Sequence, residues 1–220
     1  MQVAIPLYDG FTALDAVGPY EVLSRVPGAE MRFVGFEIGP VRTDNDQLAL
    51  QVNAELEQVP EPDVICVPGG LGSRALLDDQ RLLGWIRHAH DHSQWTTSVC
   101  TGSLLLGAAG LLQGLPATTH WLERDLLAEL GARPVTERVV AQGKIVTAAG
   151  VSSGIDMALR LVQLMHGDVA AQAIQLSIEY DPEPPVDAGS PEKAPDSVVE
   201  LVRTAAATRG EQPREVARRR

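Results

Sequence analysis

The feature that most constrains the fold is a regular alternation of two hydrophobic patterns along the chain. Short runs rich in Val, Ile and Thr and bounded by Gly and Pro are typical of strands, and the stretches between them have the apolar spacing of helices. The alternation predicts an α/β fold with a doubly wound, mainly parallel sheet and helices on both faces. Strands are expected over residues 2–7, 31–37, 63–67, 95–99 and 145–148, and helices over 13–26, 74–91, 101–112, 121–130 and 153–166.

Two segments, 40–53 and 138–148, depart from this alternation. In the second, strand-like halves flank Gln142–Gly143, which predicts a β-hairpin. An antiparallel hairpin in a parallel sheet would make the sheet mixed.

The chain shows no internal repeat and no linker-like pooling of Gly or Pro, so one domain is expected over residues 1–208. A Pro-rich connection at 181–195 precedes an expected short helix over 196–207. The Arg-rich residues 209–220 are expected to form a disordered tail.

Charge and hydropathy exclude several classes of protein. The net charge of −11 argues against nucleic acid or an anionic membrane as a general partner. The last twenty residues differ from the rest, because they contain six Arg and two Glu. The longest strictly apolar run, from Leu104 to Leu112, has nine residues, whereas a membrane helix needs about 20. The N-terminus MQVAIPLYDG lacks the basic start and cleavage site of a secretory signal, so a cytoplasmic location is expected.

The chain has two cysteines, and they stand in different settings. Cys100, in SVCTGS, comes where a predicted strand ends and a helix begins. A helix N-terminus lowers the pKa of a thiol, and a strand–turn–helix is the setting of nucleophile elbows. Cys100 is therefore the candidate nucleophile, with packing as a small apolar residue as the alternative. Cys66, inside VICV, is expected to be a buried core residue.

In a parallel sheet the loops that follow the strands meet at one edge, where ligands bind. Four loops are expected there: 8–12, 68–72, 100–102 and 149–153. The backbone N–H of Thr101 can face an anion at this edge. Gly69 and Gly70 can offer bare N–H groups as the second half of an oxyanion hole, although a glycine pair also suits an ordinary turn.

A cysteine nucleophile needs a group that moves protons. Asp15 interrupts the apolar stretch FTALDAVG near the sheet edge and is the strongest candidate, with a helix-stabilising carboxylate as the alternative. Asp9 is better explained as a turn residue, and Glu21 as a helix-surface group. His120, in ATTHW, is a candidate for a supporting role around the site.

The alternating His88, His90 and His92 could suggest a metal site, but helical spacing is expected to spread their side chains over different faces. No metal and no cofactor is expected.

Several of these motifs together carry a family resemblance: PLYDGFTALDAVGPYEVL, DVICVPGG, TSVCTGSLLLGAAGLL, ATTHW and AAGVSSGIDMAL. The chain resembles the ThiJ/PfpI superfamily, which has a class I glutamine amidotransferase-like fold, and within it the isonitrile hydratases. The resemblance spans about residues 1–203. It implies a flavodoxin-like fold, and a homodimer that hydrates a small, neutral isocyanide to an N-substituted formamide without a cofactor.

The resemblance also assigns roles. Cys100 matches the family nucleophile, Asp15 the essential carboxylate, Thr101 the residue that helps hold the anion, and Gly69 and Gly70 the opposing glycine loop. The superfamily's protease-like members have a histidine directly after the cysteine, where this chain has Thr101. That difference disfavours a peptidase.

Other functions remain open on the same residues. One is another cysteine-dependent activity, such as glyoxalase, deglycase or amidase chemistry. A redox-sensing or chaperone role would use oxidation of Cys100. A regulatory module is less expected, because about 18 residues follow the matched region, too few for a helix-turn-helix domain.

Overall fold

The computed structural model describes residues 1–211 of the chain. By its internal contacts the chain divides into two compact units, Met1–Tyr180 and a second that begins at Asp181. The division falls at the start of the Pro-rich connection, inside the single domain expected over residues 1–208. The extent of that domain stays a prediction. Of the expected tail, 209–220, the residues from 212 onward lie outside the described part of the chain.

Seven strands form the central sheet in the order β10-β11-β7-β6-β1-β2-β5. β10 runs antiparallel to β11, as the predicted hairpin requires, and the other neighbouring strands are parallel. The predicted flavodoxin-like, mainly parallel sheet is therefore confirmed. The strands are β1 Gln2–Pro6, β2 Glu30–Gly35, β5 Ala54–Glu55, β6 Val64–Val67, β7 Trp95–Val99, β10 Val139–Gln142 and β11 Ile145–Ala148.

Two small sheets accompany the central one. β3 (Gly39–Arg42) pairs antiparallel with β4 (Ala49–Val52), within one of the two segments that break the alternation. β8 (Pro116–Ala117) pairs parallel with β9 (Arg133–Pro134).

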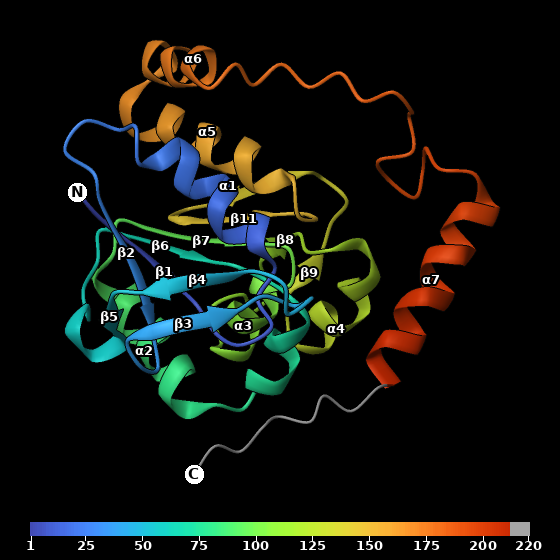
Figure 1. Ribbon diagram of the computed structural model, residues 1–220, viewed down its shortest axis with the longest axis horizontal. Coiled ribbons are helices and arrows are strands. Elements are labelled where there is room, and N and C mark those ends of the chain that lie inside the picture. Colours follow the sequence, from blue (N-terminus) through green and yellow to red (C-terminus); the bar gives the residue numbers. More distant parts are fainter. Residues whose placement is uncertain (212–220) are drawn as a thin grey trace. The chain divides into compact units, whose positions relative to one another are not determined.

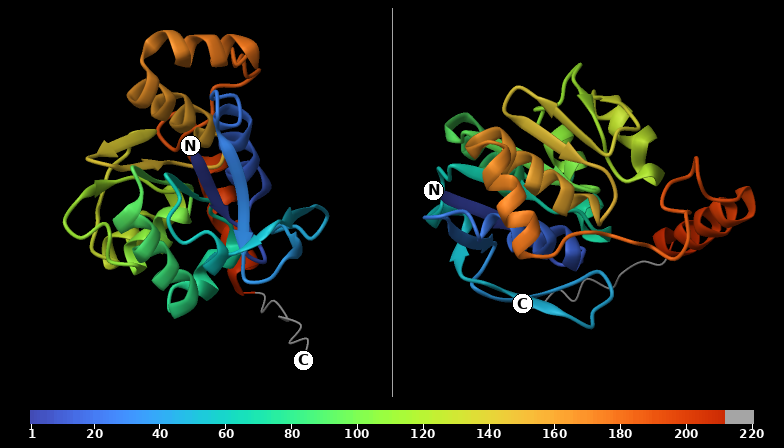
Figure 2. Two further views of the ribbon diagram at one scale, coloured as in Figure 1. Left: turned by 90° about the vertical axis from the view of Figure 1, so that its left-hand side faces the viewer. Right: turned by 90° about the horizontal axis from the view of Figure 1, so that it is seen from above.

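Helices cover both faces of the central sheet in the first unit (Figures 1 and 2). On one face α1 packs against α5, and α6 packs on α5; α2, α3 and α4 lie on the other. These helices are α1 Ala13–Leu23, α2 Gln80–His92, α3 Gly102–Ala108, α4 Arg124–Glu129, α5 Ser153–His166 and α6 Asp168–Ser177. Three short 3₁₀ turns are η1 Leu56–Gln58, η2 Leu71–Leu76 and η3 Trp121–Glu123, and the second unit contains α7, Asp196–Glu211.

The helices differ from expectation in several places. The helix predicted over 121–130 is divided into η3 and α4, and the helix predicted over 101–112 ends at Ala108. The helix predicted over 74–91 is divided into η2 and α2, because the Asp79 side chain accepts the Leu82 N–H at 2.8 Å and so caps a new helix start. The α6 helix was not predicted. The helix predicted over 196–207 continues to Glu211, into the segment expected to be a tail.

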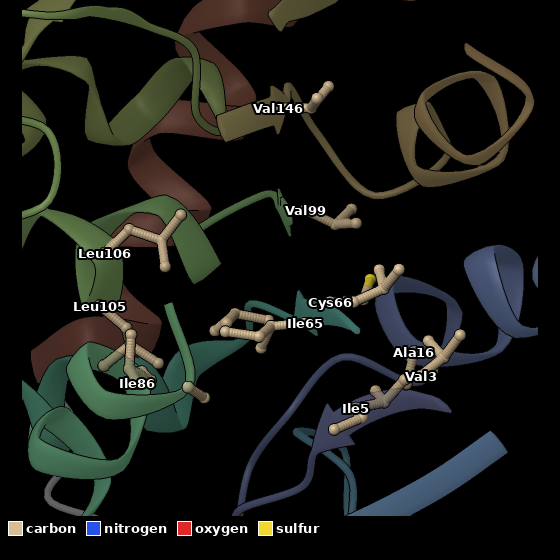
Figure 3. Packing of buried hydrophobic residues seen from close by; sticks show 14 of the residues in the cluster. Val3, Ile5, Ala16, Ile65, Cys66, Ile86, Val99, Leu105, Leu106 and Val146 are labelled. Carbon is tan, nitrogen blue, oxygen red and sulfur yellow. The ribbon is translucent and has the colours of Figure 1, made fainter. Parts of the chain in front are cut away.

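Alternation along β6 divides its side chains between the two faces of the sheet. Ile65 points toward Ile86 and Leu105, while Cys66 points to the other side, where Ala16 of α1 lies (Figure 3). Cys66 is fully buried, as expected, and burial raises its pKa to about 12. Among the described residues, no helix combines the length and apolarity that crossing a bilayer requires.

Candidate active site

The four predicted loops do meet at one edge of the sheet. They follow β1, β6, β7 and β11, which are successive parallel neighbours, so their carboxyl ends point the same way. Cys100 follows β7 at the centre of this edge and is 5% exposed.

Cys100 has a left-handed backbone conformation, with φ 55°. That conformation costs a non-glycine residue about 1–2 kcal/mol, and hydrogen bonds hold it in place. The Cys100 N–H donates to Ala148 O and Ala149 O at 3.1 and 2.8 Å. Its C=O accepts from the hydroxyls of Ser103 and Thr119 at 3.1 and 3.0 Å. This sharp turn is the elbow that the strand–turn–helix pattern predicted.

Gly102 is necessary for this turn to pack against the neighbouring loop. A Cβ built on Gly102 would lie 2.9 Å from Pro68 O and nearer still to Val67 O. A larger residue would therefore push the elbow away from the end of β6.

Asp15 is completely buried in the first turn of α1. Its Oδ2 accepts the Gly69 N–H at 2.9 Å, while Oδ1 has no well-aligned hydrogen-bond partner among the described residues. Burial raises the pKa of Asp15 from 3.8 to about 7, against the lowering effect of Gly69 and of the nearby Cys100 thiol. The carboxyl group can therefore exchange a proton near neutral pH, through an oxygen that is not otherwise engaged.

The sequence predicted a lowered pKa for the Cys100 thiol, and that direction is wrong. Hydrogen bonds from the N–H groups of Thr101 and Val151 do lower this pKa, but burial and the charge of Asp15 raise it well above its usual value. The free protein therefore holds Cys100 as a thiol, and a base must remove its proton before the sulfur can act as a strong nucleophile.

The glycine loop does not form the oxyanion hole that was expected of it. The Gly69 N–H is donated to Asp15, and the Gly70 N–H is donated to Thr101 Oγ1 at 2.8 Å. The prediction of bare N–H groups is therefore wrong. Glycine at position 69 instead permits a close approach, since a Cβ there would lie 2.6 Å from Thr101 Oγ1 and 2.9 Å from Asp15 Oδ2.

Thr101 serves the site with two different groups. Its backbone N–H hydrogen-bonds to the Cys100 sulfur. Its hydroxyl is held by the Gly70 N–H and by the Ser73 hydroxyl, at 2.8 and 3.0 Å. The side chain thus connects the elbow to the glycine loop, and the N–H is directed at the Cys100 sulfur.

Four residues that the sequence does not single out also support this site: Val151 through its N–H, Thr119 and Ser73 through their hydroxyls, and Tyr8. The Tyr8 hydroxyl donates to Pro68 O at 2.7 Å, and burial together with the charges of Asp15 and Cys100 raises its pKa well above 10. All four lie in or beside the converging loops. Their roles depend on backbone contacts, for which residue type gives no signal.

Three other candidates lie outside this hydrogen-bond network. Glu21 is on the exposed face of α1 and pairs with Arg25 at 2.7 Å, as expected of a helix-surface group. Asp9 is exposed. His120 is half-buried beside Trp121, near Gly150, and burial lowers its pKa. A supporting role for His120 stays a prediction.

Within residues 1–211, the group of side chains spaced for a metal is Glu61, His88 and His92. It shares no residue with the Cys100 site. The expectation that the histidines spread over different helix faces is wrong for this pair, because His88 and His92 are four residues apart and share a face.

Comparisons with known proteins identify the family and agree with the fold. A model of the DJ-1/PfpI family matches residues 1–164. The isonitrile hydratase of Pseudomonas putida is 46% identical over 94% of this chain and 90% of its own. A ThiJ/PfpI family protein from Pseudomonas syringae superposes with a TM-score of 0.91 at 37% identity, over 95% of this chain and 87% of its own. The transcriptional regulator CdhR of Pseudomonas aeruginosa is 28% identical over 79% of this chain, which spans 53% of that longer protein.

Proposed function

This chain belongs to the DJ-1/PfpI family, and on that premise we propose that it adds water to the carbon of an isocyanide, giving an N-substituted formamide through a covalent thioimidate on Cys100. The observation that carries the proposal is the 46% identity to an isonitrile hydratase over nearly the whole of both chains. The pairing of a buried thiol with a carboxyl group that titrates near pH 7 supports it.

The first step forms the bond between sulfur and carbon. The Asp15 carboxylate takes the proton of the Cys100 thiol, and the thiolate attacks the terminal carbon of R–N≡C. The lone pair that develops on this carbon then takes the proton back from Asp15. The product is the thioimidate R–N=CH–S–Cys100, and Asp15 is a carboxylate again.

The second step adds water to that carbon. Asp15 accepts a proton from the water as its oxygen attacks, and the C=N electron pair takes that proton at nitrogen. The resulting R–NH–CH(OH)–S–Cys100 then breaks its C–S bond. The hydroxyl proton passes through Asp15 to the departing sulfur, which releases R–NH–CHO and regenerates the thiol. One carboxyl group can serve each transfer, since its pKa of about 7 is close to neutral pH.

The burial of the site favours a small substrate without charge. Cys100 is 5% exposed and Asp15 is fully buried, so an ion would lose most of its hydration on reaching them. An isocyanide is neutral and needs no cofactor for this addition. Because the nucleophile must be a free thiol, a reducing compartment such as the cytoplasm suits the reaction. We propose a homodimer there, with no nucleic acid or membrane as a partner.

The proposal is tested by following formamide release by mass spectrometry, using a panel of alkyl and aryl isocyanides. Cys100→Ala and Asp15→Asn are each expected to lower kcat by at least about 100-fold. Cys66→Ala, the matched control at the other thiol, should retain activity. The kcat/KM of the unaltered protein should fall as the pH drops below about 7, because the base form of Asp15 is lost.

Formamide production that survives in Cys100→Ala would refute the covalent mechanism. If no isocyanide is converted while methylglyoxal is consumed, the chain is instead one of the family's glyoxalase-like enzymes.

A further inference from the structure

The last turns of α2 carry two histidines on one face, beside a carboxylate from a different segment. His88 and His92 are four residues apart, and their ring centroids are 4.5 Å from each other. Glu61 comes from the connection between η1 and β6. Its Oε1 lies 3.5 Å from His88 Nε2 and 3.6 Å from His92 Nε2.

We propose that Glu61, His88 and His92 bind a divalent transition-metal ion of the zinc class. Two imidazole nitrogens and one carboxylate oxygen are donors that Zn²⁺ commonly accepts from proteins. The ligand atoms of the three side chains all lie within 4.8 Å of one another. With no thiolate in the set, the site should follow the usual order for nitrogen and oxygen donors, in which Cu²⁺ binds more tightly than Zn²⁺.

The distances fit a shared ion better than direct hydrogen bonds. A charge-assisted N–H···O bond would bring nitrogen and oxygen to about 2.8 Å. Two ligands of a tetrahedral zinc ion, each about 2.1 Å from the metal, are about 3.4 Å apart. The separations of 3.5 and 3.6 Å from Glu61 Oε1 lie close to this second value. The carboxylate oxygen is thus spaced from each imidazole as two ligands of one ion would be, and the three ligand atoms all lie within 4.8 Å of one another.

The tautomer of His92 is also set for metal binding. His92 Nδ1 lies 2.8 Å from the backbone oxygen of His88. A carbonyl oxygen can only accept, so Nδ1 carries the hydrogen and the lone pair of the neutral ring is at Nε2. An outer hydrogen bond of this kind orients histidine ligands in metal sites and makes them more basic.

The intervening histidine does not belong to the site. His90 Nδ1 lies 2.8 Å from Thr96 Oγ1, at the start of β7, and the residue is half-buried. This explains why the H-x-H-x-H pattern yields a pair of ligands instead of three.

The site would be open on one side. The side chains of Glu61, His88 and His92 are 55%, 50% and 45% exposed. With three ligands from the protein, at least one position is left for water or an external donor. A cation here also lies at the C-terminal end of α2, where the helix dipole favours positive charge. Binding would connect α2 to the segment before β6, and should stabilise the fold by mass action.

The test is titration of the metal-free full-length protein with Zn²⁺ by calorimetry. One ion per chain is expected, and His88→Ala, His92→Ala and Glu61→Gln should each weaken binding by about 10-fold or more. His166→Ala removes an exposed histidine elsewhere and is the matched control, which should bind as the unaltered protein does. Because all four side chains are exposed, these variants should fold normally, which circular dichroism checks.

A second measurement separates this site from the reactive thiol. Co²⁺ bound by nitrogen and oxygen alone gives tetrahedral visible bands without the sulfur-to-cobalt absorption in the near ultraviolet. This spectrum should persist in Cys100→Ala and disappear in His88→Ala. Absence of saturable binding, equal binding by His88→Ala and His166→Ala, or loss of binding in Cys100→Ala would each overturn the proposal.

Discussion

Replacing Asp15 with Asn should make the protein more stable at neutral and alkaline pH while removing its activity. The carboxyl group is fully buried, and its pKa is raised from 3.8 to about 7. This change corresponds to about 4 kcal/mol, because a difference of one in pKa is worth about 1.4 kcal/mol. At pH 8 the folded protein carries the whole of this unfavourable free energy, and Asn, which has no charge to bury, avoids it.

The sign of the pH dependence follows from where the proton resides. Between pH 3.8 and about 7 the folded state keeps the Asp15 proton while the unfolded chain has released it. The unfolded state therefore binds fewer protons, and the contribution of Asp15 to the free energy of unfolding falls as the pH rises through this window. Below the window both states are protonated, so this penalty disappears.

Urea unfolding of Asp15→Asn and the unaltered protein at pH 5 and pH 8 measures the effect. At pH 8 the free energy of unfolding of Asp15→Asn should exceed that of the unaltered protein by about 4 kcal/mol. At pH 5 this excess should be smaller by about 3 kcal/mol. In a protein of this size, that difference at pH 8 is on the order of 10 °C in Tm. Other titrating groups are common to both proteins and cancel. Asp9→Asn, which changes an exposed carboxylate, is the control. Its free energy of unfolding should differ little from that of the unaltered protein, and by the same amount at both pH values.

An Asp15→Asn protein that is equally or less stable at pH 8 would refute the reasoning. It would mean that Asp15 is ionised without penalty in the folded state. The same result would remove the argument that this carboxyl group exchanges protons near pH 7.

Three further predictions concern the residues around Asp15. In Asp15→Asn, the pH dependence of Cys100 alkylation by iodoacetamide should give a lower apparent pKa for the thiol, because Asp15 raises that pKa. An unchanged pH profile would contradict this. Thr101→Val should destabilise the protein by about 1–3 kcal/mol by leaving a loop N–H unpaired, and Thr101→Ser should restore stability in urea unfolding. Gly69→Ala should reduce turnover, since its Cβ would lie 2.9 Å from Asp15 Oδ2, whereas Gly84→Ala in α2, which has space for a methyl group, should leave kinetics unchanged.

The fold was predictable where local pattern and tertiary environment agree. β7 and β11 begin and end at the predicted residues, because their β-branched runs are bounded by turn residues and buried in the sheet. The α6 helix was missed because its inward face consists mainly of the small side chains of Ala170 and Ala171 beside Ile174. Val169 and Leu176, which are 80% and 81% exposed, put apolar residues on the outer face as well, and this obscures the helical pattern in the sequence.

The meeting of the candidate residues at one sheet edge was predictable, but their hydrogen bonds were not. The strand–turn–helix pattern identifies Cys100, and the charge within an apolar stretch identifies Asp15. The partner of the Gly69 N–H depends on where α1 packs, 54 residues away in the chain. The pKa of Cys100 likewise depends on burial and on Asp15, and these outweigh the short α3 helix that the sequence reveals.

The two oxygens of Asp15 have different surroundings, and the glycine loop accounts for the difference. Oδ2 is fixed by the Gly69 N–H, so the carboxyl group cannot turn away from the elbow. Oδ1 has no well-aligned partner among residues 1–211, so a proton can leave or arrive there without another hydrogen bond being broken. A buried oxygen without a partner destabilises the fold, and so does the left-handed backbone of Cys100. Both features belong to groups that the proposed reaction uses, so substitutions at this sheet edge are expected to separate stability from activity.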